Sequence, residues 1–324
     1  MYYATGIKIH GTKSFRLSCS QLLGHYGGNA QNPPAALARC ITPSNPATKS
    51  FVQPDQSGAE SLIVAMESEP GLYRRIIEAG IKQHSYIALH LFLDKFRGKH
   101  SRDRYWKIDP FELRELPEWK DLAKAIKNSG APYDLGKMTN HARGYKMKWP
   151  TFQIKVLTDT EGRVVLSNSE AKEFLNLWDE LFPEVVDLQD RTEHRLRTTR
   201  TLVNLLGFPR IFYGRMSDEL IREAISWVPQ STVGCITHNA VCDFQDYIDE
   251  NDLDDWWLLN NKHDSYLAEV PDEQVEYCIP AMRAAIEVDL VSSRGEKFKM
   301  KSGVSVGKNW DKYSEENPLG MREL

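Results

Sequence analysis

Short extended segments stand on either side of a long helical stretch, and this layout constrains the fold more than any other feature. Residues 51–55 read as a strand, and residues 256–260 and 266–270 read as two strands joined by a tight turn. Helical periodicity recurs between them, from about residue 72 to residue 147. The sequence therefore predicts a chain that is mainly helical in its middle and takes strands from both ends.

Other local patterns predict the remaining elements. Ser57 and Glu60 have the spacing of a capping box, which predicts a helix directly after the first strand. Residues 152–157 and 163–166 flank a turn that contains glycine and are interpreted as a hairpin, after which Ser169 can cap a helix. Helices are also expected from Ser217, from Gln230 to about residue 249 and from Pro271 to about residue 288, with short strands at 298–301 and 304–306.

Composition excludes several classes of protein. The 324 residues are 41% hydrophobic, enough to bury a core, and 41 basic against 45 acidic residues give a formal net charge of -4. This balance argues against non-specific binding to nucleic acid, although basic strips can be local. Five cysteines without a C-x-x-C pair, and an N-terminus without a secretory pattern, favour the cytoplasm. The longest apolar run, residues 86–92, is too short to span a membrane, so no membrane partner is expected.

Two aspartates stand at the ends of the extended segments. Asp55 ends the first predicted strand and Asp264 lies at the tip of the predicted hairpin, 209 positions later. If these strands are neighbours in one sheet, both carboxylates emerge at one edge, where they could hold a pair of divalent cations. Two such ions stabilise the attacking and leaving oxygens of a phosphoryl displacement. The alternative is that each aspartate is an ordinary turn residue.

A series of motifs resembles one family. Residues 55–60, D-Q-S-G-A-E, resemble the D-Y-S-Q-x-E palm motif of DNA polymerases of the polymerase I type, family A. Further motifs follow in the order typical of that family. Residues 12–20 and 28–34 resemble its T-G-R-L-S-S and N-L-Q-N-I-P strip, 137–145 its fingers motif K-x-x-x-[F/H]-x-x-x-Y, 230–232 its Q-[GS]-T, 262–271 its V-H-D-[E/S]-x-x-x-E-V-P hairpin, and 307–310 its terminal G-x-N-W.

The resemblance implies a fold and an activity. The implied fold is α+β, a palm with a small antiparallel sheet and a helical fingers insertion. Residues 1–69 would form the first part of the palm, residues 70–205 the fingers and residues 206–324 the second part of the palm. The implied activity is template-directed DNA synthesis, in which a deoxynucleoside triphosphate (dNTP) extends a primer 3′-hydroxyl with the help of two Mg²⁺ ions. Its partners would be primer-template DNA and dNTP.

The resemblance also implies roles for individual residues. Asp55 and Asp264 would be the catalytic pair that binds the metal ions. Glu60 would be the steric gate that collides with the 2′-hydroxyl of a ribonucleotide. Four residues would bind the incoming nucleotide and its template partner: Lys137 and His84 at the phosphates, His141 against the base and Tyr145 on the template side. The primer-template contacts would come from Arg16, Ser18, Ser20, Gln31, Asn32, Gln230 and His263.

Each role has a structural alternative. His84 lies on the apolar face of a predicted helix and could be a core histidine, and Glu60 could serve only as the capping partner of Ser57. His141 and Tyr145 could be packing residues, and Lys137 could be a solvated lysine. Only the ordered set of motifs favours the functional reading of all of them together.

The sequence also departs from the family pattern. Tyr133 stands where the fingers helix usually carries an arginine, so a phosphate contact is missing unless Arg143 or Arg74 replaces it. Lys146 follows the fingers tyrosine, where glycine is usual. The remaining departures are Gln56 and Gly58 in the first palm motif and Asn261 and Lys262 before His263.

The N-terminal boundary is a further departure. Family members carry a thumb, and usually a 3′–5′ exonuclease domain, before the strip that begins here near residue 12. The chain is therefore expected to lack both domains and to act as a fragment or split subunit, with a separate thumb or exonuclease polypeptide as a partner. Basic clusters at 95–107 and 194–200 could line a DNA groove or be solvated surface.

Two other functions stay open. A phage-type single-subunit RNA polymerase also has an H-D-S hairpin, but Glu60 and the Q-N-P strip favour DNA, because those enzymes have glycine at the gate. The second alternative is a non-catalytic subunit that binds nucleic acid or supports assembly. Tyr133 and the missing thumb favour that alternative, whereas the presence of Asp55, Asp264 and Lys137 argues against it.

Overall fold

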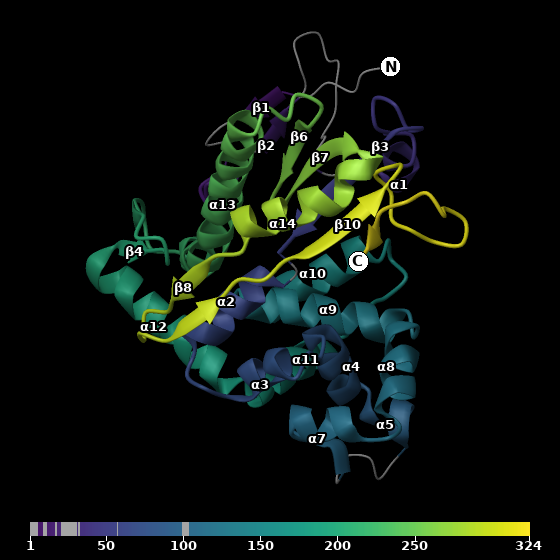
Figure 1. Cartoon of the computed structure of the whole chain (residues 1–324). Helices are drawn as coiled ribbons and strands as arrows, with labels where there is room; N and C mark the ends of the chain where they lie inside the picture. Colours follow the sequence, from purple (N-terminus) through teal and green to yellow (C-terminus); the bar gives the residue numbers. More distant parts are fainter. Residues whose placement is uncertain are drawn as a thin grey trace. The chain divides into compact units, whose positions relative to one another are not determined.

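The computed structural model describes residues 6–8, 12–16, 18–20, 31, 33–56, 58–98 and 104–324. These residues form two compact units, each built from segments that are separate in the sequence (Figure 1). Unit 1 contains the described residues within 1–61, together with 203–208 and 227–324. Unit 2 contains 62–202 and 209–226. The helices α2 (Ala59–Glu67) and α13 (Asp218–Glu250) belong in part to each unit.

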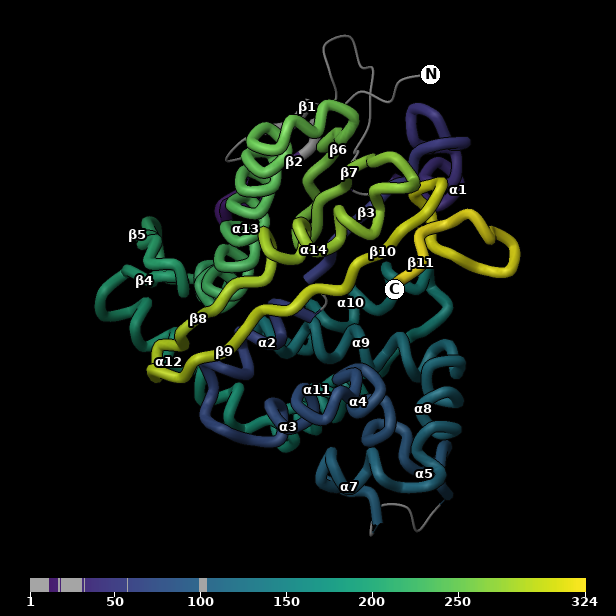
Figure 2. The backbone as a smooth tube through the Cα atoms, viewed as in Figure 1, coloured from purple at the N-terminus to yellow at the C-terminus, as the bar shows by residue number. Residues whose placement is uncertain are grey.

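A five-stranded antiparallel sheet is the centre of unit 1. Its strands lie in the order β11-β10-β3-β7-β6, so the middle strand comes from the start of the chain and its neighbours from the end. Figure 2 shows β10 and β11, in yellow, returning to β3. The bounds are β3 (Lys49–Asp55), β6 (Trp257–Lys262), β7 (Ser265–Pro271), β10 (Gly303–Gly307) and β11 (Arg322–Glu323). The predicted α+β class with a small antiparallel sheet is confirmed.

Apolar side chains bury the two central strands. Every residue of β7 is buried, and Phe51 and Val52 of β3 are at most 1% exposed. The helix α14 (Val275–Ile286) packs on this sheet, and the side chains buried along it are four residues apart: Cys278, Met282 and Ile286. That spacing puts them on one helix face, which accounts for the packing.

Glu269, a residue of the hairpin motif, also binds the loop before β3. Glu269 of β7 is 2% exposed, and its carboxylate accepts hydrogen bonds from both the backbone N–H and the hydroxyl of Ser44. Lys49 lies 3.4 Å from the same carboxylate. A buried charge needs such partners, so this glutamate has a structural role that the motif alone does not reveal.

Short elements complete unit 1. The strands β1 (Gly6–Lys8) and β2 (Ser18–Ser20) pair with each other, and β8 (Asp289–Val291) pairs with β9 (Lys297–Lys299). Unit 1 also contains α1 (Ala35–Ala38) and a 3₁₀ turn η1 (Asp272–Gln274). The strands β4 (Thr201–Val203) and β5 (Pro209–Ile211) pair with each other; β5 and all of β4 except Val203 belong to unit 2.

Unit 2 is helical. Its helices pack around two apolar clusters, of which the larger includes Ile76, Tyr86, Leu113 and Trp178, and the smaller includes Phe152. The helices are α3 (Leu72–Glu78), α4 (Gln83–Leu91), α5 (Leu93–Arg97), α7 (Pro110–Glu115), α8 (Trp119–Lys127), α9 (Ala131–Gly144), α10 (Trp149–Asp159), α11 (Asn168–Leu181) and α12 (Pro183–Thr199).

The predicted hairpin around residues 158–162 is wrong. Its first arm lies in α10, where Phe152 and Val156 are buried four residues apart, which is a helical and not a strand period. The turn ends that helix, with Glu161 and Gly162 both at positive φ. The cap of α11 is Ser167 and not Ser169, and it forms a complete capping box with Glu170.

The two helices predicted from Ser217 and from Gln230 are one helix, α13, of 33 residues. Pro229 lies inside it, where the sequence suggested a break. The capping residue Ser57 lies outside the described residues, so its capping box stays a prediction.

We predict that a methyl group at Gly136 destabilises unit 2. A Cβ at this position of α9 would lie 2.7 Å from the carbonyl oxygen of His84 and 2.8 Å from the Cβ of Ala88, both on α4. Because these are backbone and first side-chain atoms, α4 and α9 would have to separate, and Gly136→Ala should lower the free energy of unfolding by about 1–3 kcal/mol. Urea denaturation measures this change.

Gly144→Ala is the matched control. Gly144 ends the same helix and has open space where a Cβ would stand. Alanine there should be neutral or should stabilise by up to about 1 kcal/mol. Equal losses at both positions would contradict the close packing of α4 on α9.

Candidate functional site

Strand pairing brings the two aspartates together. In the ladder of β3 and β7, Asp55 stands opposite Ser265, the residue after Asp264. The backbone N–H of Gln56 donates to the carbonyl oxygen of Asp264 at 3.0 Å. Two residues that are 209 positions apart in the sequence thus lie at the same end of one sheet.

The donor set at this sheet end suits a hard divalent cation. Asp55 and Asp264 are both partly exposed, so a metal ion and a phosphate could reach their oxygens. Mg²⁺ typically takes one or two protein carboxylates and completes its shell with water and substrate phosphates. In the described part of the chain, no group of three or more His, Cys, Asp and Glu side chains could hold a metal. The pair could therefore hold Mg²⁺ only together with oxygens from a substrate or from water.

A hydrogen-bonded chain that the sequence analysis missed supports this sheet end. The indole N–H of Trp310 donates to Gln53 Oε1 at 2.7 Å, and Gln53 Nε2 donates to Ser265 Oγ at 3.1 Å. Gln53 precedes Asp55 by two positions on β3, and Ser265 is the cross-strand partner of Asp55, so all three side chains belong to one face. The terminal G-x-N-W motif was the only sequence signal for this link.

Arg16, Glu60 and His263 form a second group beside the aspartates. The Arg16 guanidinium makes an ion pair with the Glu60 carboxylate. Burial lowers the pKa of His263, and the charges of Arg16 and Lys262 lower it further, while Asp264 and Glu60 oppose them. The imidazole is therefore neutral near pH 7. Its Nδ1 is buried, and within the described residues it has no hydrogen-bond partner.

The strip that contains Arg16 packs along α13. Trp227 Nε1 donates to the carbonyl oxygen of Lys13 at 3.0 Å, and the ring of Phe15 lies 6.3 Å from that of Trp227. A Cβ at Gly234 would come within 3.2 Å of the Ser14 carbonyl oxygen. This helix therefore needs a small residue where the strip crosses it.

The other predicted primer-template residues are less closely grouped. Gln31 donates from Nε2 to the carbonyl oxygen of Asn261 at 3.0 Å, which places it beside the hairpin of β6 and β7. Gln230 is half-buried in α13, and Ser18 and Ser20 lie on β2. Asn32 lies outside the described residues. The role of each of these residues in DNA binding stays a prediction.

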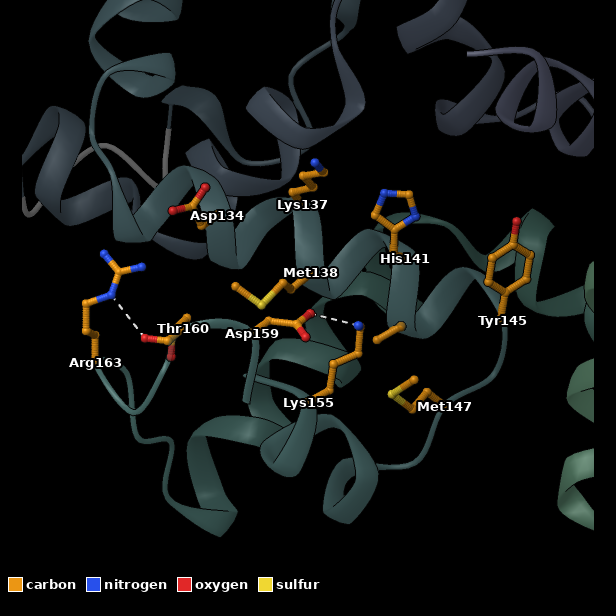
Figure 3. Close-up of a pocket in the computed structure, with 11 residues that line it drawn as sticks. Asp134, Lys137, Met138, His141, Tyr145, Met147, Lys155, Asp159, Thr160 and Arg163 are labelled. Atoms are coloured by element: carbon orange, nitrogen blue, oxygen red, sulfur yellow. Dashed lines mark hydrogen bonds and ion pairs between the residues drawn. The ribbon is translucent and has the colours of Figure 1, made fainter. Parts of the chain in front are cut away.

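A second candidate group lies in unit 2. Lys137, His141 and Tyr145 rise from the same side of α9 (Figure 3), as their four-residue spacing predicts. They line a cavity of about 610 Å³ between α9 and α10. The other lining residues are Asp134, Met138, Ala142, Met147, Lys155, Asp159, Thr160 and Arg163.

His84 of α4 joins this group. Its ring centroid lies 5.5 Å from that of His141 and 6.4 Å from that of Tyr133. The pKa of His84 is lowered to about 4, mainly by burial and also by the nearby His141, Lys137 and Lys82. Lys137 and two histidine rings thus lie close together, beside a cavity that Asp134 and Asp159 also line.

Neither arginine suggested as a replacement at Tyr133 is available. Arg143 makes two hydrogen bonds of 2.6 Å to Asp179, and Arg74 makes an ion pair of 2.8 Å with Glu78. Both guanidinium groups already have carboxylate partners. Either residue would have to leave its carboxylate partner to replace the missing arginine, and that replacement stays a prediction.

No helix within the described residues is both long enough and apolar enough to cross a membrane.

Comparisons with known proteins support the fold. No protein-family model matches the chain, and no curated protein matches it by sequence. Among solved structures, it is similar to the POL domain of Pol1 from M. smegmatis in complex with DNA primer-template and dNTP, with a TM-score of 0.66 and 18% sequence identity. The similarity covers 95% of this chain and 48% of that one, so the chain spans about half the length of that structure. The chain thus shares its fold with about half of that POL domain.

Proposed function

We propose that this protein is a template-directed DNA polymerase, which transfers a nucleotidyl group from dNTP to a primer 3′-hydroxyl. The observation that carries the proposal is the pairing of β3 with β7, which puts Asp55 and Asp264 at one sheet end. Their carboxylates would hold two Mg²⁺ ions, which supply charge stabilisation to the reacting phosphate when bound. The polymerase fold supports the same reading.

The other residues of the two groups bind and orient substrates in this proposal. Lys137 receives the triphosphate through its ammonium, and His84 donates to it when the bound anion favours its protonation. His141 lies against the incoming base and Tyr145 contacts the template side. Glu60 excludes the 2′-hydroxyl, and its ion pair with Arg16 holds the gate in place.

The partner of the chain is also part of the proposal. The solved structure that it resembles is about twice as long, and phosphate contacts supply most of the non-specific affinity for DNA. We propose that a separate polypeptide supplies the thumb and exonuclease functions. A non-catalytic subunit remains the competing function, and the first experiment below distinguishes the two.

Replacing either aspartate should abolish synthesis. Asp55→Asn and Asp264→Asn should each lower the rate of primer extension by about a thousandfold, because each removes a metal ligand worth several kcal/mol of transition-state stabilisation. Single-turnover extension of a labelled primer with Mg²⁺ measures the rate. Asp289→Asn, on strand β8 outside the five-stranded sheet, removes an exposed carboxylate and is the control. A wild-type chain that binds primer-template but never extends it would support the non-catalytic function.

Two substitutions of Glu60 distinguish the effect of its side-chain volume from the effect of its charge. Glu60→Ala should reduce discrimination against ribonucleotides by at least about tenfold, because it opens space where the 2′-hydroxyl would lie. Glu60→Gln keeps the side-chain volume but weakens the pair with Arg16, and it should retain most of the discrimination. The ratio of kcat/KM for dNTP and for ribonucleotide measures the effect. Unchanged sugar preference in an active Glu60→Ala variant would show that Glu60 is not the gate.

Triphosphate binding should be linked to protonation of His84. The pKa of His84 is about 4 in the free protein, and a bound anion stabilises the imidazolium, so binding should raise this pKa. Affinity for tripolyphosphate should then increase as the pH falls from about 7 toward 5. NMR titration of the His84 ring, with and without tripolyphosphate, measures both values.

The same shift predicts how stability depends on pH. An unfolded histidine titrates near 6.5, so the unfolded chain binds the proton more readily, and stability should fall as the pH decreases from about 6.5 to about 4. His84→Gln should flatten this dependence. A His84 pKa near 6.5 that tripolyphosphate leaves unchanged would contradict the phosphate-binding role.

A further inference from the structure

The C-terminal end of α9 has a left-handed cap at a lysine. Lys146 has a φ of 56°, and its N–H donates to the carbonyl oxygen of Arg143 at 2.9 Å. The N–H of Met147 donates to the carbonyl oxygen of Ala142 at 2.9 Å. These two bonds define a Schellman motif, whose left-handed position usually takes glycine because a Cβ is crowded there. Lysine therefore occupies a position that the backbone geometry favours for glycine.

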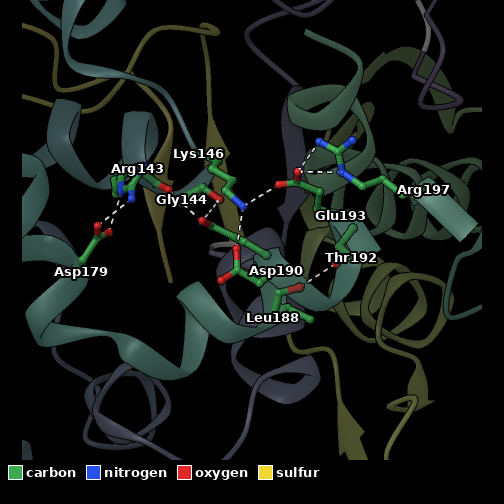
Figure 4. Close-up of polar contacts among 10 residues, drawn as sticks. Arg143, Gly144, Lys146, Asp179, Leu188, Asp190, Thr192, Glu193 and Arg197 are labelled. Carbon is green, nitrogen blue, oxygen red and sulfur yellow. Dashed lines mark hydrogen bonds and ion pairs between the residues drawn. The ribbon is translucent and has the colours of Figure 1, made fainter. Parts of the chain in front are cut away.

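The side chain of Lys146 is anchored on α12. Its ammonium lies 2.6 Å from Asp190 and 2.7 Å from Glu193, and Figure 4 shows it between the two carboxylates. Burial opposes the charge, but the hydrogen bonds to Asp190 and Glu193 raise the pKa of Lys146. The hydrogen bonds from Lys146 and Arg197 lower the pKa of Glu193. The lysine thus stays charged and paired at neutral pH.

Neighbouring contacts hold the same helix end. Gln189 of α12 is 1% exposed, and its Nε2 donates to the carbonyl oxygens of Arg143 and Gly144 at 2.8 and 3.0 Å. These carbonyls belong to the last turn of α9, where the regular N–H partner four residues later is missing, and that of Arg143 also accepts the N–H of Lys146. Arg143 is also bonded to Asp179 of α11 through both oxygens of that carboxylate. The last turn of α9 is therefore held from two other helices.

Tyr145 is the residue that this arrangement affects most directly. It is the C-cap of α9, with a φ of -111°, and it lines the cavity beside His141. We propose that Lys146 is a positioning residue for Tyr145: its ammonium, tied to Asp190 and Glu193, holds the cap that sets the direction of the Tyr145 ring and so the template-side contact. This proposal rests on the proposed polymerase function only for the identity of that contact.

The positioning itself can be measured without activity. 3-Fluorotyrosine placed at position 145 should give one narrow ¹⁹F resonance in the otherwise unchanged protein. The double variant Asp190→Asn/Glu193→Gln, which removes both anchors, should broaden or split this resonance. Asp187→Asn is the matched control, because Asp187 is an exposed carboxylate on the same helix that pairs with Arg191 and not with α9. It should leave the resonance unchanged.

The same carboxylate changes in a Lys146→Gly variant distinguish positioning of Tyr145 from a general stabilisation of the fold. Lys146→Gly relieves the left-handed backbone and also removes the tether, so it should fold well, yet broaden the Tyr145 resonance. Adding the carboxylate changes to this variant should have no further effect, because the tether is already lost. An unaltered resonance in the double variant would overturn the proposal. Equal effects of the carboxylate changes with lysine and with glycine at position 146 would overturn it too.

The functional consequence is a loss of selectivity. In primer extension, the ratio of incorrect to correct insertion should rise about fivefold in the double variant and in Lys146→Gly, the factor expected for one partly buried ion pair. If the fluorine spectra change but misinsertion does not, Tyr145 is not positioned for template contact and that part of the proposal fails. If the wild-type chain does not extend primers, the polymerase function is refuted. The fluorine spectra would still show whether Lys146 positions Tyr145.

Discussion

The candidate site depends on the pairing of β3 with β7. Closing a loop of 209 residues costs roughly 5 kcal/mol of chain entropy, so the pair must gain at least that much by burial. Val52, Ala268 and Val270 are fully buried, and each large aliphatic side chain contributes about 1.5–3 kcal/mol. Together with Phe51 and Tyr266, these side chains offset the closure cost. The apolar residues of the two strands thus explain why the polar residues at their ends meet.

The register of this pairing matters as much as its strength. A slip of one residue would turn Asp55 to the opposite face of the sheet and away from Ser265. The hydrogen bonds from Trp310, which follows β10, to Gln53 of β3 and from Gln53 to Ser265 of β7 fit the observed register. This chain of hydrogen bonds therefore stabilises the alignment that the two carboxylates need. It gives the C-terminal motif a structural reason to accompany the two aspartates.

The sequence predicted the parts whose pattern is local and regular. The strand that ends at Asp55 and the hairpin with Asp264 at its tip were predicted from apolar runs bounded by turn residues, and both are observed. The predicted strand at residues 152–157 is wrong because a short apolar run fits a strand and a buried helix equally well. In the structure, Phe152 and Val156 are buried four residues apart on one face of a helix.

Side-chain pairs between distant segments could not be predicted at all. The pair of Arg16 with Glu60 and the anchoring of Lys146 on α12 join residues about 44 positions apart. No local pattern encodes such partners. The family pattern has glycine at the position of Lys146. Only the backbone of the structure shows that this lysine adopts the left-handed conformation for which glycine is usual.

Charge pairing decides which cations around α9 can serve a substrate. Arg143 is paired with Asp179, Lys146 with Asp190 and Glu193, and Lys155 with Asp159. Within the described residues, no carboxylate forms an ion pair with Lys137. Burial is the main cause of the lowered pKa of His84, and the charge of Lys137 contributes to it. A cation that already has a carboxylate partner gains little from a phosphate, whereas an unneutralised one gains much. Arg143 of α9, Lys146 just after it and Lys155 of α10 thus use their charge to fix the structure, whereas Lys137 keeps a charge that no carboxylate among the described residues neutralises. This difference in pairing is the physical basis for proposing Lys137, and not Arg143, as the cation that receives the phosphates.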